Sequence, residues 1–137
     1  MNADQTFLET TLTHEIIGAF YRVYNALGYG FLETVYQRAM AHELAKRGVR
    51  VDREYLSPVF YDGVEVGHYR ADLVAGGKVV IEVKASQRLV ESDRKQVLNY
   101  LRSTSLEVGL LLHFGPKAQL HRFAYSNTPK PARSANK

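Results

Sequence analysis

The sequence predicts an α/β domain in which a mixed central sheet is flanked by helices. Two observations predict this class. Apolar residues recur at helical spacing in two stretches near the N-terminus and in one later stretch, whereas β-branched and aromatic residues, separated by turn dipeptides, fill the segments between and after them. The predicted order is ααβββ(β)αββ, and 137 residues with 45% hydrophobic content suffice for a single hydrophobic core.

Two N-terminal helices are predicted on either side of a glycine-rich joint. The first spans residues 13–27, with Thr13 as its N-cap and Gly28 as its stop. The second spans residues 31–47 and ends at Gly48. The apolar stripe of the second helix comprises Leu32, Val35, Tyr36, Ala39, Met40 and Leu44.

The strand-forming segments follow these helices. The dipeptide 62–63 (Asp-Gly) is a strong hairpin signal, and the dipeptide 76–77 (Gly-Gly) marks a second turn, after which an apolar strand of central type begins. The second turn therefore places Asp72 and Glu82 on neighbouring strands. In order, the predicted elements are strands over 49–61, 64–69, 70–74 and 78–84, a helix over 91–102, and strands over 108–114 and 120–125.

Composition excludes several kinds of site. The chain has no cysteine, so it has no disulfide, no thiolate zinc site and no thiol nucleophile. Its five histidines show no paired metal-ligand spacing, so zinc is not expected. Residues 1–10 lack the apolar core of a signal peptide, and no apolar run approaches the roughly 20 residues that span a bilayer. We therefore expect a cytoplasmic protein with no membrane partner.

The net charge of +4 is a weak argument for a nucleic-acid partner. Three basic residues, Lys130, Arg133 and Lys137, lie in the last twelve residues, which contain no acid, so the rest of the chain is nearly neutral. We expect a folded domain over 1–125 and a disordered basic tail over 126–137. Whether the tail is only a solvated terminus or a loose phosphate-binding arm stays open.

Asp72, Glu82 and Lys84 are the candidate catalytic charges. We expect the Asp72 side chain to lie on the strand face opposite to Ala71 and Leu73, and Glu82 and Lys84 share one face of an otherwise apolar strand. Charged groups in such positions lose solvation, and they persist when they are paired with one another or with a metal. A cross-strand ion pair of Lys84 with Asp72 or Glu82 is therefore the alternative to a catalytic site.

Two carboxylates that converge across a tight turn make an oxygen-ligand site of the kind that Mg²⁺ prefers. Phosphodiester hydrolysis needs this arrangement, because the metal polarises a phosphoryl oxygen and activates water. A nearby ammonium offsets the charge that develops at phosphorus, and Lys84 is placed for this task.

Two helices supply further candidates. Glu33 lies at the flank of the apolar stripe of the second helix, although the helix dipole alone also favours an acid in a first turn. Gln96 and Tyr100 share one face of the third helix, with Arg94 and Lys95 beside them. Such groups suit contact with phosphates, and an ordinary surface pair is the alternative.

Four ordered motifs together resemble the GxxExxY protein family, a branch of the PD-(D/E)XK nuclease superfamily close to the RecB-like nuclease domains. The likeness covers the chain from about Thr13 to Phe123 and implies a restriction-endonuclease-like sandwich. The matching residues, in chain order, are Gly30, Glu33 and Tyr36, then 69–72 (YRAD), 81–84 (IEVK) and 96–100 (QVLNY).

The resemblance implies a role for each matching residue. Asp72 and Glu82 would bind Mg²⁺ or Mn²⁺, with the Val83 carbonyl as a further ligand. Glu33 would support the metal directly or through water. Lys84 would assist the attacking water, and Gln96 would orient the active-site groups. The residues expected to contact nucleic acid are Tyr36, Arg70, Arg94, Lys95 and Tyr100.

The leading hypothesis is a metal-dependent nuclease that cuts nucleic acid, with DNA as the expected substrate. The alternatives are a nucleic-acid-binding or protein-binding module that keeps the fold without cutting, and an ion-pair network in a protein with another role. Small nucleases of this kind often pair to cut two strands, so the resemblance is also compatible with a homodimer.

Overall fold

The computed structural model describes residues 9–126 and confirms the predicted α/β class. In this part of the chain five strands form one sheet in the order β1-β2-β3-β4-β5, with β3 and β4 parallel and the other neighbours antiparallel. The expected tail lies outside the described residues except for Ser126. The elements are α2 (Thr10–Leu27), α3 (Glu33–Lys46), β1 (Val51–Tyr61), β2 (Val64–Ala75), β3 (Val79–Lys84), α4 (Glu91–Ser103), β4 (Val108–Phe114) and β5 (Ala118–Ala124).

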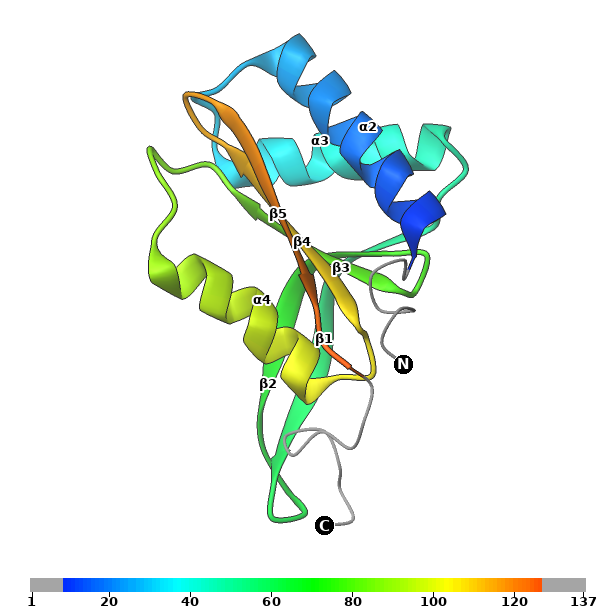
Figure 1. Cartoon of the computed structure of the whole chain (residues 1–137), viewed down its shortest axis with the longest axis vertical. Helices are drawn as coiled ribbons and strands as arrows, with labels where there is room; N and C mark the ends of the chain where they lie inside the picture. The colour runs from blue at the N-terminus through cyan, green and yellow to red at the C-terminus, as the bar shows by residue number, and fades with distance from the viewer. Residues whose placement is uncertain (1–8, 127–137) are drawn as a thin grey trace.

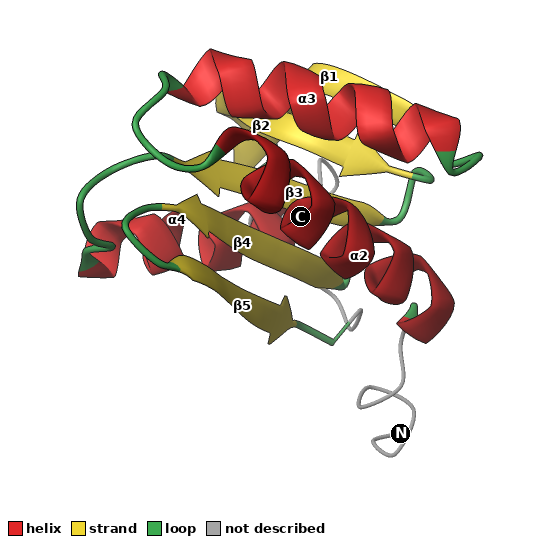
Figure 2. Cartoon of the chain, turned by 90° about the horizontal axis from the view of Figure 1, so that it is seen from above, coloured by secondary structure: helices red, strands yellow, loops and turns green. Residues whose placement is uncertain are grey.

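Helices cover both faces of the sheet. α2 and α3 lie on one face and α4 lies on the other (Figures 1 and 2). Because a tight turn cannot join two parallel strands, β3 continues into β4 through α4 as a crossover helix. The crossover brings the first turn of α4 next to the end of β3.

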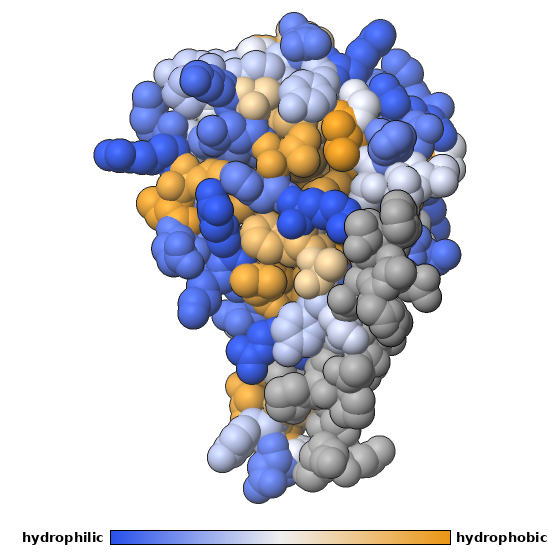
Figure 3. All heavy atoms as spheres, in the orientation of Figure 1, coloured by the Kyte–Doolittle hydropathy of each residue, from blue (hydrophilic) through white to orange (hydrophobic). Residues whose placement is uncertain are grey.

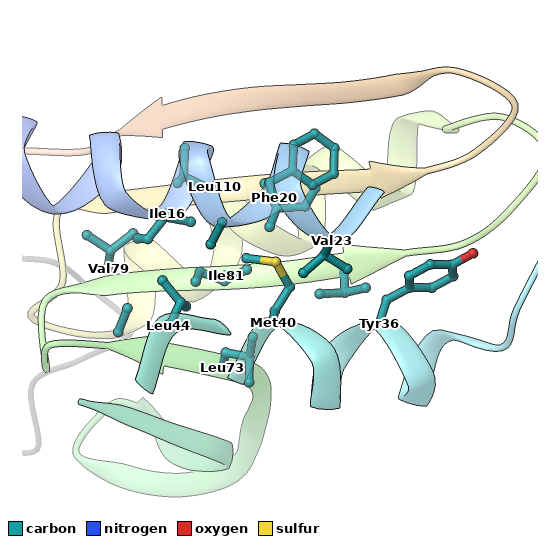
Figure 4. Packing of buried hydrophobic residues seen from close by; sticks show 14 of the residues in the cluster. Ile16, Phe20, Val23, Tyr36, Met40, Leu44, Leu73, Val79, Ile81 and Leu110 are labelled. Atoms are coloured by element: carbon teal, nitrogen blue, oxygen red, sulfur yellow. The ribbon is translucent and has the colours of Figure 1, made fainter. Parts of the chain in front are cut away.

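The larger core lies between the sheet and the pair α2 and α3. Phe20 of α2 and Met40 and Tyr36 of α3 are fully buried against apolar side chains of the central strands (Figure 4). Phe114, the last residue of β4, has its ring centroid 4.2 Å from that of Tyr36 and 4.9 Å from that of Phe20. Each aromatic pair of this kind contributes about 0.5–1.5 kcal/mol beyond simple burial. These contacts fix the first turn of α3 relative to the sheet.

A smaller core lies between the sheet and α4. Val97 and Leu101 of α4 pack on Val80 and Leu111. A Cβ atom on Gly109 of β4 would lie 2.7 Å from Val97 Cγ1, which is too close for a real contact. The helix therefore approaches the sheet where β4 has no side chain.

The start of α2 differs from the prediction. The helix begins at Thr10, and Thr13 is buried inside it, where its hydroxyl donates to the carbonyl oxygens of Glu9 and Thr10 at 3.0 Å each. A hydroxyl that bonds backward in this way belongs to a helix interior and not to an N-cap. The predicted end of the helix is confirmed, because Gly28 adopts a φ of +69° directly after Leu27.

The buried face of α3 is narrower than predicted. Tyr36, Met40 and Leu44 are buried as expected, but Leu32 is 78% exposed and precedes the first helical residue, and Val35 is also exposed. The helix places Tyr36, Met40 and Leu44 along its line of contact with the sheet. Leu32 and Val35 fall outside that line, so the prediction for these two residues was wrong.

The alternation of β2 is interrupted at Asp72. Ala71 belongs to the core beneath α4, whereas Leu73 belongs to the core beneath α2 and α3, so the two neighbours point to opposite faces. The prediction that they share a face was wrong. Across the hairpin from Asp72, Glu54 has a φ of +51°. The β1–β2 register pairs Arg53 with Leu73 and then Tyr55 with Ala71, so it skips the position where Glu54 and Asp72 would pair. Irregularities of this kind re-aim a side chain.

The outer part of the β1–β2 hairpin, residues 55–71, extends beyond the rest of the sheet, and we call it the hairpin arm (Figure 1). β2 pairs with β3 only over Leu73–Ala75, so residues 64–72 have β1 as their one strand neighbour in the described chain. The two strands predicted over 64–69 and 70–74 are thus a single strand. Apolar side chains that have no helix to cover them are consequently exposed on the arm: Tyr61, Val64 and Val66.

The surface combines apolar and hydrophilic regions. Apolar side chains gather across the middle of the face seen in Figure 3, whereas hydrophilic side chains dominate its upper end. Among the described residues, no helix has both the length and the apolar character needed to cross a membrane.

Candidate active site

The site begins where β2 and β3 separate. Their pairing ends at Leu73–Ile81, and beyond this point the Asp72 side chain replaces the next backbone bond: the Val83 backbone N–H donates to Asp72 Oδ2 at 2.8 Å. The Asp72 backbone N–H in turn donates to Glu82 Oε2 at 3.4 Å. These two hydrogen bonds hold the acids together at the gap in the sheet, on neighbouring strands as predicted.

Glu82 is the most deeply buried acid of the site. Its side chain belongs to a residue that is 2% exposed, and burial, followed by the negative charge of Asp72, raises the pKa of its carboxyl to about 8. Burial also raises the pKa of the Asp72 carboxyl, against the opposing effect of its hydrogen bond from Val83. A hydrogen bond between the two carboxyls favours the proton on Glu82. Of the two carboxyls, Glu82 is therefore the one that keeps its proton more readily near neutral pH.

Lys84 forms its ion pair with α4. Its Nζ lies 3.8 Å from Oδ1 of Asp93, and the two side chains are only 20% and 15% exposed. Neither Asp72 nor Glu82 lies within 4.0 Å of this ammonium. The positive charge still acts on both carboxyls, lowering their pKa values. The cross-strand ion pair that was the alternative to a catalytic site is therefore not formed.

Glu33 reaches the same place from α3. Burial raises the pKa of its carboxyl, and the charge of Lys84 is the strongest opposing influence. The backbone of Ala85, just past the end of β3, also hydrogen-bonds to this carboxyl. Gly28 and Gly30, with φ values of +69° and +117°, allow the sharp turn between α2 and α3 that aims the first turn of α3 at β3.

These side chains line one open cleft of about 510 Å³. The cleft contains all five residues expected to be catalytic, and it adds Arg70 from the group expected to bind nucleic acid. Three layers of the fold contribute, since α3, the sheet and α4 each supply at least one side chain. The lining residues are Glu33, Leu56, His68, Tyr69, Arg70, Asp72, Glu82, Lys84 and Gln96.

Two tyrosines expected to contact nucleic acid are buried instead. Tyr36 is fully buried, and its hydroxyl donates to the Gly28 carbonyl at 2.7 Å, bracing the joint before α3. Tyr100 is 2% exposed, and its hydroxyl shares a hydrogen bond of 2.9 Å with Ser57 Oγ on β1. Because neither ring reaches the surface, the expectation of direct contact with nucleic acid is corrected for both residues.

Arg94 and Lys95 are exposed on α4 but do not line the cleft. An Arg94 Nη2 atom lies 3.3 Å from His121 Nε2 on β5. Successive residues of a helix are rotated by about 100° around its axis. Because Gln96 faces the cleft, the side chains of Arg94 and Lys95 point away from it. The structure does not bring them to the carboxylates.

Sequence reasoning missed four residues at or beside the site: Asp93, Glu54, His68 and Leu56. Asp93 is the ion-pair partner of Lys84, and Glu54 is close enough to raise the pKa of Asp72. His68 lines the cleft from the hairpin arm. Only Asp93 had a sequence signal, because an acid in the first turn of a predicted helix indicates a capping role.

Asp72 and Glu82 are the two carboxylates that the structure brings together in the cleft, and Glu33 lines the same cleft. Among residues 9–126 no group of three or more His, Cys, Asp or Glu side chains is arranged to hold a metal ion. Glu33 therefore lines the cleft without completing a cluster with Asp72 and Glu82. The Val83 N–H points to Asp72, and because the N–H and C=O of one strand residue point to the same edge, the Val83 carbonyl oxygen faces that edge of β3 as well.

Comparison with known proteins identifies the family. A model described as the PD-(D/E)XK nuclease superfamily matches residues 10–123, nearly the whole described chain. The chain belongs to the PD-(D/E)XK nuclease superfamily. Membership agrees with the observed order of two helices, a mixed five-stranded sheet and a crossover helix, which is that of a restriction-endonuclease-like fold. A superfamily of nucleases also points to nucleic acid as the substrate class.

Other comparisons add less to this superfamily assignment. No curated protein matches the chain significantly. Among solved structures, the crystal structure of SSO0001 matches with a TM-score of 0.46 and 19% identity, over 66% of this chain and 48% of that one. The chain thus spans about half the length of that protein.

Proposed function

We propose that this protein is a metal-dependent nuclease that hydrolyses phosphodiester bonds of DNA, and that it belongs to the GxxExxY branch of its superfamily. The observation that supports this most strongly is the Asp72–Glu82 pair at the gap between β2 and β3, in one cleft with Lys84. Membership in the superfamily supports a nucleic-acid substrate.

The donor set fits Mg²⁺ or Mn²⁺. Two adjacent buried carboxyls repel each other when both are ionised, and one retained proton relieves that repulsion. A divalent cation does the same with greater charge, so it would displace the proton and bind both acids. Asp72, Glu82 and the Val83 carbonyl would be its protein ligands, and Glu33 would interact through water. So few protein ligands suit Mg²⁺, which usually keeps several waters.

Each of the other cleft residues has a task that its position allows. The metal, when bound, would supply Lewis-acid chemistry toward a phosphoryl oxygen and the attacking water. The Lys84 ammonium offsets negative charge that develops on the phosphate. Gln96, with both amide donors and a carbonyl acceptor, orients water or phosphate oxygens. Arg70, which lines the same cleft, binds a neighbouring phosphate of the DNA strand.

The test is cleavage of supercoiled plasmid and of linear DNA by purified protein with Mg²⁺, with Mn²⁺ and with chelator. We expect metal-dependent cleavage that falls by about a hundredfold or more in Asp72→Asn and in Lys84→Met. Lys78→Met is a matched control, because Lys78 lies at the turn before β3 and away from the cleft. Metal-independent cleavage, or cleavage that survives Asp72→Asn, would contradict the proposal.

The same variants and conditions distinguish a nuclease from a module that binds nucleic acid without cutting it. DNA binding that is unchanged by chelator and by Asp72→Asn, in the absence of cleavage, would favour such a module. The expected homodimer stays a prediction, which sedimentation equilibrium of the full chain tests directly.

A further inference from the structure

Asp93 lies outside the motifs that suggested the function, and yet it is the residue that pairs with Lys84. We infer that Asp93 is a positioning residue, which holds the Lys84 ammonium beside the cleft and away from the metal-binding carboxylates. The inference rests on the proposed nuclease function and names a residue on which that function depends.

The Asp93 carboxylate is fixed in orientation because its two oxygens have separate partners. Oδ2 accepts the Val90 backbone N–H at 2.9 Å, which satisfies a free donor at the start of α4. Oδ1 is then directed at Lys84 Nζ, 3.8 Å away. The side chain thus connects the first turn of α4 to the end of β3.

The surroundings make this contact more effective than a surface ion pair. Both side chains are mostly buried, so solvent and salt screen their attraction less than they would at the surface. The loop between β3 and α4 is also held in place, because His113 Nε2 lies 2.7 Å from the Ser86 carbonyl oxygen. Held between two anchored elements, Asp93 has little freedom to move away from Lys84.

Without Asp93, the ammonium would have other acids to approach. The charge of Lys84 already lowers the pKa of Asp72, Glu82 and Glu33, which shows that all three carboxyls lie within its electrostatic reach. A lysine has a flexible four-carbon stem, so an unpaired Lys84 would turn toward them and compete with a metal ion. Asp93 therefore keeps the cation available to substrate while leaving the carboxylates to the metal.

Asp93→Asn tests this role, because asparagine retains an oxygen that can accept the Val90 N–H but has no charge to hold Lys84. Glu91→Gln is the matched control: Glu91 also lies in the first turn of α4, is exposed, and loses the same charge near the helix N-terminus. With plasmid DNA and Mg²⁺, we expect Asp93→Asn to lower kcat about tenfold or more, as misplacement of a catalytic group does. Glu91→Gln should stay within about twofold, since it keeps that group in place.

A double-mutant cycle separates positioning from simple support of the fold. In the Lys84→Met background, Asp93→Asn should change the residual rate by less than about twofold, because the group that it positions is already gone. Effects of Asp93→Asn and Lys84→Met that multiply independently would overturn the inference.

The midpoint of urea unfolding supplies a readout that does not need activity. Asp93→Asn should lower the midpoint of the wild-type protein by more than it lowers that of Lys84→Met, whereas equal shifts in both backgrounds would overturn the ion pair itself. If the wild-type protein cuts no DNA, the proposed function fails while the unfolding cycle still decides whether Asp93 holds Lys84.

Discussion

The Asp72 carboxylate accepts a hydrogen bond from the backbone N–H of Val83 at 2.8 Å, at the point where β2 and β3 stop pairing. A side chain therefore completes a bond that a neighbouring strand would otherwise make. The same bond fixes the direction of a candidate metal ligand, so the local structure of the sheet and the chemistry of the cleft depend on one residue.

Asp72→Ala and Asp72→Asn should separate these two contributions. Asparagine can still accept the Val83 N–H, whereas alanine leaves this donor without its partner, which costs about 1–3 kcal/mol for a buried group. We expect both variants to lose about a hundredfold or more of any cleavage, as when a group that stabilises transition-state charge is removed. Only Asp72→Ala should also lower the free energy of unfolding measured in urea, and equal stabilities would contradict this account.

The metal-free protein should become less stable as the pH rises from about 4.5 to about 8. Glu82 has a raised pKa in the folded state, so its contribution to stability is complete below the pKa of the unfolded chain and is lost as the folded protein gives up the proton. One proton released corresponds to about 1.4 kcal/mol per pH unit. Glu82→Gln should remove most of this slope, which thermal unfolding at a series of pH values measures; an unchanged slope would assign it to other groups.

Mg²⁺ should bind more tightly as the pH increases toward 8. Binding to Asp72 and Glu82 requires that the shared proton leave, and a single proton released gives up to about tenfold in affinity per pH unit. Calorimetry in two buffers with different ionisation enthalpies should report release of about one proton near neutral pH. Binding without proton release would indicate that the ion avoids Glu82.

The hydrogen bond between Tyr100 and Ser57 should contribute measurably to stability. Tyr100→Phe leaves the buried Ser57 hydroxyl without this partner, at a cost of about 1–2 kcal/mol. Adding Ser57→Ala to Tyr100→Phe should restore part of the loss, because neither partner is then left alone. Tyr61→Phe is the control, since Tyr61 is exposed at the end of the hairpin arm and should change stability by less than about 0.5 kcal/mol.

Gly30→Ala should be more costly than its open surroundings suggest. A Cβ atom there would meet no atom within 4 Å, but the φ of +117° is one that an L-residue rarely adopts. We expect a loss of about 1–3 kcal/mol from backbone strain alone. Gly67 has equally open surroundings but no positive φ, so Gly67→Ala should change the free energy of unfolding very little. Similar losses of stability in the two variants would indicate side-chain crowding instead of backbone strain.

Patterns local in the chain predicted most of the fold. Turn dipeptides at 62–63 and 76–77 have geometries that only certain residues adopt readily, so they located both hairpins and placed Asp72 beside Glu82. The helical repeat placed Met40 and Leu44 in the core. It could not exclude Leu32, because a repeat gives relative angles and does not show where a helix starts to touch the sheet.

The features that escaped prediction depend on contacts between distant segments. The irregular backbone opposite Asp72 involves Glu54, a residue type that gives no warning of a positive φ. Lys84 has four acids within its electrostatic reach, and its choice of Asp93 depends on where the crossover helix begins. Tyr100 matches a functional motif, but its burial follows from the approach of α4 to β1.

The early separation of β2 from β3 has an evolutionary consequence. Within residues 9–126, the two strands of the hairpin arm pair only with each other. The base of the arm supplies part of the cleft lining through Leu56, His68 and Arg70. Insertions, deletions or substitutions in the outer arm would leave the register of β3 and β4 unchanged. The arm is therefore a segment whose outer part can change while the arrangement of Asp72, Glu82 and Lys84 stays the same.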